Sequence, residues 1–251
     1  MNRFIKRIYI IMGFLIIVAL CFGLLTKKSF KKSSTNLEFY NDAQVSLSDS
    51  IEGYFDNDIE GYDELFEKSD LIVVGKVAGK RETYNQAFKT KFKVNKIIKD
   101  DSAAQLPKSI YVFEPSYFYF DSYDVASGYN IMLDNTDYIL FLKHLDVPDG
   151  YTYKNDESIT FLPVSSYYGK YTLNDNRNEE VIHPNEDLTY KDVKSMGVLT
   201  EEKDIIDTYN TIKSQINNEM NHHSISWDSV AFSLTVGHIL PFLFPVLHGQ
   251  L

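Results

Sequence analysis

The strongest pattern in the chain is an apolar run close to its start. Ile8 to Thr26 are nineteen residues without a charged side chain, and basic residues stand on both sides of them. A helix rises about 1.5 Å per residue and the hydrocarbon core of a bilayer is about 30 Å thick, so this run is just long enough to cross a membrane. We therefore predict that residues 1–32 form a membrane anchor with basic flanks. The bulky side chains expected to face lipid are Ile8, Phe14, Ile17, Leu20 and Leu24.

Two processing events are alternatives to an uncleaved anchor. A cleaved signal peptide has a shorter apolar part, of about 7–15 residues, followed by a small-x-small site. Ala19 with Cys21, or Cys21 with Gly23, offers a weak site of that kind, but apolar residues continue through Leu25. Attachment of a lipid to Cys21, the only cysteine, is disfavoured because Leu20 stands where such signals need a small residue. An uncleaved transmembrane helix is the better interpretation.

A long β-hairpin is predicted where the folded domain begins. A short helix over 62–68 leads into 70–77, whose β-branched residues at Ile72–Val74 indicate a well-buried strand. Residues 88–94 alternate between apolar and cationic side chains, as in a strand with one wet face. The apolar pair Ile97–Ile98 interrupts this alternation, which predicts a bulge or a strand end.

Further strand patterns follow at short spacing, with turn residues between them. They cover 109–114, 117–120, 138–142, 151–154, 159–164 and 167–173. Many short strands with few intervening helices predict an α+β, mainly β fold built on an antiparallel OB-like barrel or a sandwich.

The period changes to that of helices near the C-terminus. Thr189–Asp192 resembles a capping box and predicts a short helix ending near Gly197. A longer amphipathic helix is predicted to start after an N-cap at Thr200 and to pack on the barrel, with its apolar side chains at Ile205, Tyr209, Ile212, Ile216 and Met220.

These patterns divide the chain into four parts. After the anchor, residues 33–62 are polar and are predicted to be a stalk, although Tyr54 and Phe55 offer an alternative in which the segment docks on the domain. Residues 63–223 form the predicted barrel domain with its C-terminal helix. Residues 224–251 are an apolar tail. Its stretch 230–247 is either a second membrane contact, despite two prolines that would kink a helix, or a segment that packs on the domain or is disordered.

Charge favours a domain outside the cell but does so indirectly. Lysines and arginines flank the apolar run on both sides, so their bias does not orient it. The chain beyond residue 32 carries 18 basic and 35 acidic residues, a balance of −17. This balance is a poor match for nucleic acid or for an anionic cytoplasmic leaflet. We expect a cell-membrane protein, a single-pass signal-anchor type, with its acidic domain extracytoplasmic.

No pattern in the sequence specifies a catalytic, metal or cofactor site. There is no Gly-x-Ser-x-Gly elbow and no His-Glu-x-x-His, and the adjacent His222 and His223 point about 100° apart on a helix. The acidic stretches 134–137 and 175–179 lack the glycine and the final glutamate of a calcium loop, so we interpret them as turns. Paired carboxylates such as Glu179–Glu180 or Asp100–Asp101 are expected from composition alone. We predict no cofactor and no metal.

Aromatic side chains are the one candidate binding feature. They concentrate between 117 and 129 and again at 167–168, and exposed aromatics stack on sugar rings or anchor protein partners. A place in the core or rim of the barrel is the simpler explanation. The candidate partner-binding residues are Tyr117, Phe118, Tyr119, Tyr167 and Tyr168.

Three segments together resemble a known class of protein. Ser69–Val77, Phe92–Lys99 and Tyr138–Leu142 are similar in pattern to membrane-tethered surface proteins of Gram-positive bacteria. That resemblance covers about 69–173 and implies an oligonucleotide/oligosaccharide-binding-type barrel, similar to the netrin-like module of tissue inhibitors of metalloproteases. The reactive N-terminal cysteine of those inhibitors has no counterpart here, so no functional residue is carried over.

The sequence favours a membrane-anchored, non-catalytic binding protein. Its expected partners are the lipid bilayer and a cell-envelope protein or glycan, with no nucleic acid. One alternative is a glycan-directed enzyme that uses two carboxylates about 5–9.5 Å apart. Another is an accessory subunit of a membrane complex to which the tail contributes a second span.

Overall fold

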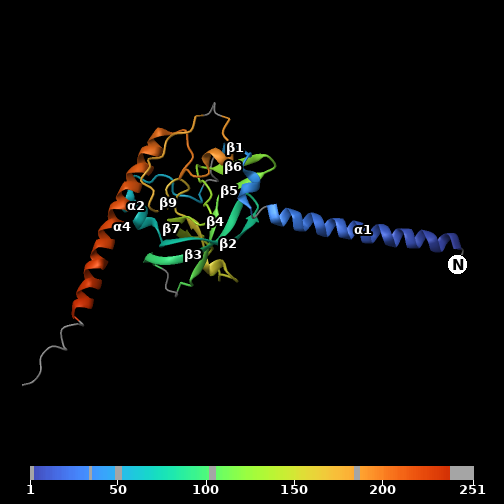
Figure 1. Ribbon diagram of the computed structural model, residues 1–251, viewed down its shortest axis with the longest axis horizontal. Coiled ribbons are helices and arrows are strands. Elements are labelled where there is room, and N and C mark those ends of the chain that lie inside the picture. The colour runs from blue at the N-terminus through green and yellow to red at the C-terminus, as the bar shows by residue number, and fades with distance from the viewer. Residues whose placement is uncertain (1–2, 34–35, 49–52, 102–105, 184–186, 238–251) are drawn as a thin grey trace, which may run out of the picture.

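Helix α1 (Arg3–Ser33) carries the apolar run and projects from the rest of the molecule in the computed structural model, which describes residues 3–33, 36–48, 53–101, 106–183 and 187–237 (Figure 1). Its segment Phe4–Thr26 is long and apolar enough to cross a membrane. All five predicted lipid-facing residues, Ile8, Phe14, Ile17, Leu20 and Leu24, are exposed to solvent in the isolated chain. The predicted N-terminal helix of membrane-spanning length is confirmed.

The domain is α+β and mainly β, with a mixed sheet of six strands. Along this sheet the order is β2–β3–β4–β8–β7–β9, and β2 pairs in addition with β7. The strands are β2 (Leu71–Tyr84), β3 (Ala87–Asp100), β4 (Ser109–Glu114), β7 (Asp137–His144), β8 (Thr160–Pro163) and β9 (Lys170–Thr172). The prediction of a purely antiparallel sheet is wrong at one place, because β4 and β8 are parallel. The chain passes through other strands between these two and returns in the same direction, as parallel pairing requires.

The hairpin of β2 and β3 agrees in detail with its sequence pattern. Its two strands are antiparallel, and their register shifts between Ile72 and Val73 so that Ile98 is left without a partner. This is the bulge predicted from the broken alternation. Gly75 lies at a second shift, where a Cβ atom would stand 2.0 Å from the backbone oxygen of Lys93. Only glycine allows β3 to approach β2 so closely.

Two other strand predictions need correction. Residues 151–154 form no strand and belong to a loop that ends in the 3-10 turn η2 (Glu157–Ile159). Of 167–173, only Lys170–Thr172 pairs with a neighbouring strand. Tyrosines alternate with polar residues in 151–154, but there they pack on each other rather than on a sheet, with the rings of Tyr151 and Tyr153 6.1 Å apart.

A second, three-stranded sheet includes residues predicted to be a stalk. Strand β1 (Gln44–Ser48) runs parallel to β6 (Ser122–Ala126), which is antiparallel to β5 (Ser116–Tyr119). The 3-10 turn η1 (Leu37–Tyr40) precedes β1 and buries Leu37. Further on, Ile59 is buried in the main core. The described part of 33–62 therefore packs on the domain, because isolated apolar residues in a polar sequence are enough to fix it.

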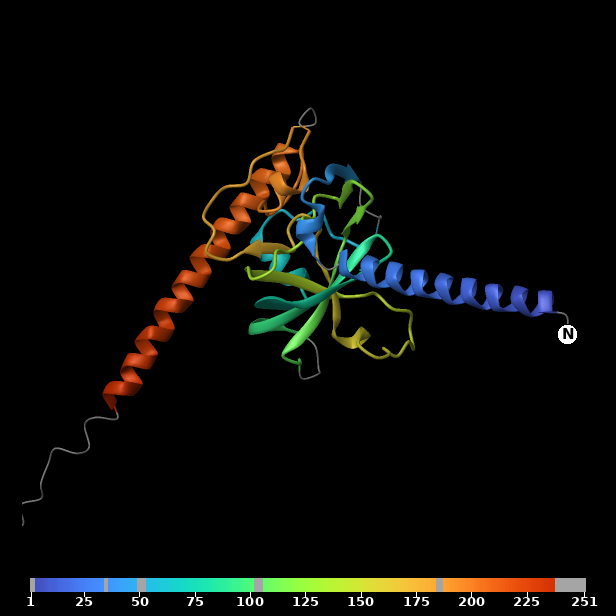
Figure 2. The same cartoon turned by 45° about the vertical axis from the view of Figure 1, so that its right-hand side comes forward.

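Helices cover one side of the domain. Helix α2 (Tyr62–Lys68) and α3 (Tyr190–Val193) are short, and α3 has the predicted capping box at Thr189. Helix α4 (Lys203–Gly237) packs on the main core through its first half, as the amphipathic pattern predicts (Figure 2). The apolar residues of α4 buried there are Ile206, Tyr209, Ile212 and Ile216, and Lys213 is buried beside them.

Helix α4 also changes the predicted boundary of the tail. The boundary at 223/224 lies inside this helix, which continues to Gly237. The rest of the predicted membrane stretch, residues 238–247, lies outside the described residues, as do the side chains of His222 and His223.

The burial of Leu37 gives a first prediction. Leu37→Ala should lower the free energy of unfolding by about 2–5 kcal/mol, because the substitution removes buried methyl groups and leaves a cavity. Glu38→Ala, on the exposed neighbouring side chain, should change it by less than about 0.5 kcal/mol. Urea unfolding of the detergent-solubilised protein measures both values, and equal effects would show that residues 36–40 do not belong to the folded domain.

Candidate functional site

The five aromatic residues proposed from the sequence do not share one face. Tyr168 is 3% exposed and belongs to the core beneath α4. Phe118 stacks between Tyr40 and Tyr123, at ring distances of 4.2 and 4.7 Å. Along a strand, successive side chains point to opposite faces, so Tyr117 and Tyr119 lie away from Phe118. The predicted binding face is therefore divided between the core and separate parts of the surface.

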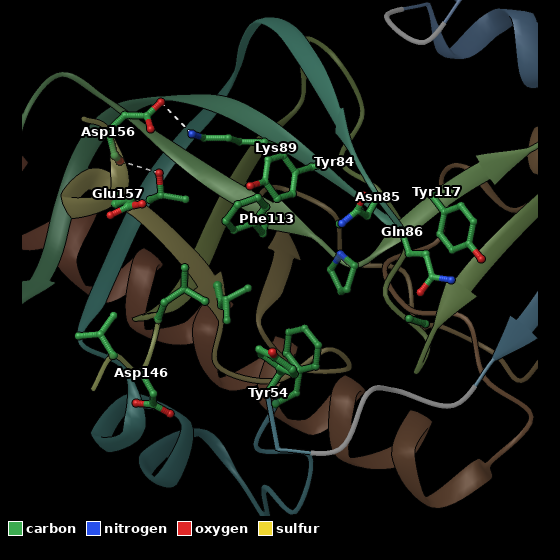
Figure 3. Close-up of a pocket in the computed structure, with 18 of the residues that line it drawn as sticks. Tyr54, Tyr84, Asn85, Gln86, Lys89, Phe113, Tyr117, Asp146, Asp156 and Glu157 are labelled. Carbon is green, nitrogen blue, oxygen red and sulfur yellow. Dashed lines mark hydrogen bonds and ion pairs between the residues drawn. The ribbon is translucent and has the colours of Figure 1, made fainter. Parts of the chain in front are cut away.

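A large cleft lies on the side of the main sheet that carries β3 and β4, and only Tyr117 of the five residues lines it. Its volume is about 960 Å³. The walls come from the turn between β2 and β3, from β3 and β4, from the β7–β8 connection and from residues 54–55 (Figure 3). Seven aromatic side chains line what we call the aromatic cleft: Tyr54, Phe55, Tyr84, Phe113, Tyr117, Tyr151 and Tyr153.

Regular strand geometry places two of these rings. In β4 every second side chain is buried, so that Phe113 points outward between the buried Val112 and Glu114. The Tyr84 ring lies 5.4 Å from the Phe113 ring. Tyr84 pairs with Ala87 across a two-residue turn in which Asn85 has a φ of +51°. Asparagine tolerates this left-handed conformation better than most residues, which keeps the turn tight.

Acidic groups outnumber basic ones in the aromatic cleft. Its one lysine, Lys89, lies 2.7 Å from a carboxylate oxygen of Asp156 and over the ring of Tyr111. Glu157 accepts hydrogen bonds from the Lys154 amide at 2.7 Å and the Tyr151 hydroxyl at 2.8 Å. With Asp146 included, the lining of the cleft holds three carboxylates and one ammonium group.

The hydrogen bonds at Glu157 decide which chemistry suits it. The Lys154 amide and then the Tyr151 hydroxyl lower the pKa of Glu157. A general acid in glycoside hydrolysis needs a raised pKa, so that it holds its proton near neutral pH. Glu157 is therefore suited to accept hydrogen bonds from a ligand and not to donate a proton to one.

The carboxylate pairs considered from the sequence do not form a second site. Glu179 is buried, and its Oε1 lies 3.4 Å from Nζ of Lys213, whereas Glu180 is exposed. Asp101 is exposed and pairs with Lys99 at 3.0 Å. Neighbouring residues in extended chain point in opposite directions, so sequence adjacency does not bring their carboxylates together.

In each of the acidic stretches 134–137 and 175–179, an aspartate is held in an ion pair with an arginine and is not an open ligand for a metal ion. Asp134 pairs with Arg81 at 2.7 Å, and Asp175 pairs with Arg177 at 3.0 Å. Within the described ranges, no three His, Cys, Asp or Glu side chains are placed to hold a metal ion. The ring of His144 packs on Phe161 at 4.3 Å.

A cluster of buried charges lies inside the sheet next to the cleft. Arg81 is 3% exposed and Glu114 is fully buried, and Nε of Arg81 lies 3.4 Å from Oε1 of Glu114. Glu114 also accepts hydrogen bonds from the Thr90 hydroxyl and from the Met132 amide. Burial by itself lowers the pKa of Arg81, but Glu114 and Asp134 outweigh it and raise the pKa above its usual value. This cluster is closed and satisfied, so its role is structural.

Lys170 is a second buried cation, on the short strand β9. Its ammonium group donates to the backbone oxygen of Gly197 at 3.1 Å and lies over the rings of Tyr129 and Tyr138. Burial lowers the pKa of Lys170 to about 8, although the charges of Glu114 and Glu179 act against this shift. Lys170 does not line the aromatic cleft.

Sequence reasoning missed most of the aromatic cleft. Tyr54, Tyr84, Phe113 and Tyr151 come from four segments far apart in the chain. The one signal available was the alternation of 109–114, which places Phe113 on the outer face of its strand.

Comparisons with family models, with curated proteins and with solved structures find no match for this chain.

The Arg81–Glu114 pair yields a prediction about stability. Glu114→Ala should cost about 3–5 kcal/mol of unfolding free energy, because it leaves a buried guanidinium without its one buried countercharge among the described residues. Asp134→Ala, whose carboxylate is more than half exposed, should cost less than about 1 kcal/mol. Denaturant unfolding compares the two variants, and similar losses would refute the buried pair as a structural centre.

Lys170 yields a prediction about pH. Its folded pKa of about 8 is below the ordinary value of 10.5, so the unfolded chain binds more protons between these values. The unfolding free energy should therefore rise with pH from about 8 to about 10, by up to about 1.4 kcal/mol per unit from this group.

Lys170→Met should lack that rise. Above about pH 10 the buried tyrosines lower the unfolding free energy of both proteins as the pH rises, because their pKa values are higher in the folded state than in the unfolded chain. Urea unfolding across this range measures the difference, and parallel pH profiles would contradict the assignment.

Proposed function

We propose that this chain is a membrane-anchored, non-catalytic binding protein that holds a cell-envelope oligosaccharide in the aromatic cleft. The observation that carries the proposal is the cleft itself, in which seven aromatic side chains stand beside amide and carboxylate groups. Aromatic faces stack on the apolar faces of sugar rings, and fixed polar groups bind the hydroxyls around them. Tyr54 and Tyr84 lie on opposite sides of the open space (Figure 3).

We infer further that the main sheet is an OB-type barrel. The support is its pairing, which runs β2–β3–β4–β8–β7 and returns to β2, with the one parallel pair between β4 and β8. OB-folds bind oligonucleotides and oligosaccharides on the face of their second and third strands and on two loops, which join strands 1 to 2 and 4 to 5.

The aromatic cleft occupies the corresponding parts of this sheet. If β2 is the first strand of the barrel, the two loops are the Asn85–Gln86 turn and the β7–β8 connection, and the face is that of β3 and β4. An analogy between folds gives only the place of a site. The side chains in that place give the class of ligand.

Charge favours an oligosaccharide over an oligonucleotide. A phosphate backbone needs unpaired Lys or Arg side chains, and Lys89 is paired with Asp156. The cleft has an excess of carboxylates, and so does the chain beyond residue 32. These groups suit a neutral glycan that donates hydroxyl protons.

The proposed location rests on α1 and on this same charge. Phe4–Thr26 supports anchoring in a membrane, and the acidic domain supports a position on the outer side of it. An oligosaccharide of the cell envelope is the ligand that a domain in this position would meet.

Loss of two stacking rings should weaken binding strongly. Tyr84→Ala together with Phe113→Ala should reduce the affinity for β-1,4-linked N-acetylglucosamine oligomers by about 5- to 150-fold, because each ring contributes about 0.5–1.5 kcal/mol. Calorimetry on the full chain in lipid nanodiscs measures this affinity.

The matched control is Tyr119→Ala, which removes an exposed aromatic outside the cleft and should leave the affinity unchanged. Equal affinities of the double variant and the parent would place the ligand elsewhere. Binding of a proline-rich peptide in the cleft, with no binding of any oligosaccharide, would show that the glycan assignment is wrong.

A further inference from the structure

Three large aromatic side chains stand exposed on η1, the first element after α1, and at the end of β5 with the turn that follows it. Phe120 is 80% exposed, Phe39 is 73% exposed and Tyr119 is 62% exposed. The aromatic cleft does not include any of them. We call these three residues the exposed aromatic patch.

The backbone conformation of Phe120 is unfavourable for a phenylalanine, so the packing of the domain does not explain why an exposed aromatic residue stands at this position. Tyr119 pairs with Ser122, so Phe120 and Asp121 form a two-residue turn between β5 and β6. Phe120 has a φ of +51°, a left-handed conformation that favours glycine and is rare for a bulky residue. An exposed aromatic ring in a strained turn position contributes little to folding, and strain of this kind is characteristic of functional positions.

Direct contacts fasten this turn to the chain that leaves α1. Helix α1 ends at Ser33, and η1 begins only four residues later at Leu37. The Tyr40 ring of η1 stacks on Phe118 of β5 at 4.2 Å, and the Gln44 amide donates to the Asp121 carbonyl at 2.7 Å. Figures 1 and 2 show the three-stranded sheet on the side of the domain where α1 joins it.

We propose that the exposed aromatic patch inserts into the interface of the membrane in which α1 is anchored and so seats the domain on the lipid surface. The inference rests on the proposed anchoring. Aromatic residues concentrate at the boundary between head groups and acyl chains, where amphipathic and apolar rings are stabilised. If Phe4–Thr26 spans the hydrocarbon core, Phe39 follows its end by only thirteen residues, seven of which continue α1 at about 1.5 Å each.

The charges around the patch identify which part of the lipid it contacts. Glu38, Asp42 and Asp121 are exposed beside the three rings. They would be repelled by anionic head groups, so the residues next to the rings do not attract such lipids, and the lysines that could do so belong to the flank of the anchor at residues 27–32. The apolar rings must supply the contact at the patch, which predicts insertion into a membrane of zwitterionic lipid alone.

Seating the domain in this way would also orient the aromatic cleft. Strand β5 carries Tyr117, which lines the cleft, and Tyr119, which belongs to the patch. The two side chains are separated by one residue on a paired strand. A contact at the patch therefore restricts rotation of the cleft relative to the bilayer.

The test uses the full chain in phosphatidylcholine vesicles, with and without bromine on the acyl chains. Trp227→Phe removes the only native tryptophan, and Phe120→Trp then places a single reporter in the turn. At an insertion depth of about 5–10 Å we expect blue-shifted emission and about a twofold loss of intensity with brominated lipid. Tyr119→Trp reports on the same patch from the strand, should the turn variant fail to fold.

The matched control is Ile97→Trp in the same background, on an exposed position of β3 outside the patch. It should emit as a water-exposed indole and lose no intensity with brominated lipid. The protein floats with the vesicles if α1 is anchored. If both patch reporters then emit at the long wavelength of a water-exposed indole and are not quenched, the seating is wrong although the anchor is intact. Protein that does not float would overturn the anchoring itself and with it this contact.

Discussion

The buried pair of Arg81 and Glu114 is the interaction on which the rest of the domain depends. Arg81 comes from β2, Glu114 from the end of β4, and Thr90, which donates to Glu114, from β3. Burial of two charges costs several kcal/mol per ion unless hydrogen bonds satisfy them. Here the Met132 backbone bonds both partners, so the pair also fixes the loop that leads into β7.

The same pair positions the aromatic cleft. Phe113 precedes Glu114 in β4, so the inward direction of the carboxylate sets the outward direction of the ring. Tyr84 lies three residues after Arg81 in β2 and packs on Phe113 from the neighbouring hairpin. The hydrogen-bonded charges inside the sheet thus fix the positions of the exposed aromatic rings outside it. The same strands β2 and β4 therefore supply both the buried ion pair and the lining of the cleft.

Features of the fold could be predicted from the sequence where they depend on interactions within one segment, and could not where they depend on contacts between distant segments. The apolar run of α1, the β2–β3 hairpin with its bulge at Ile98, and the apolar stripe of α4 are periodic within one segment, and the sequence was sufficient for them. Strands β1 and β6 have only five residues each and contain polar side chains, and they form because they pair with each other 78 residues apart. The aromatic cleft is likewise assembled from distant segments, and no spacing in the sequence marks Tyr54 as a neighbour of Tyr84. The aromatic-rich segments did contain binding candidates, but the burial of Tyr168 and the partial burial of Phe118 could be decided only by the packing of α4 and η1.

Gly75 has a consequence for how this chain can change over time. The space for a side chain at that position is already occupied by the carbonyl of Lys93 and the ring of Phe92. Exposed residues of β3 such as Lys91 and Lys93 can be replaced with little effect on packing, whereas position 75 accepts a single amino acid for as long as the two strands keep this separation. Lineages of this domain would therefore diverge quickly in the loops and the wet face of the hairpin, around one glycine that stays constant.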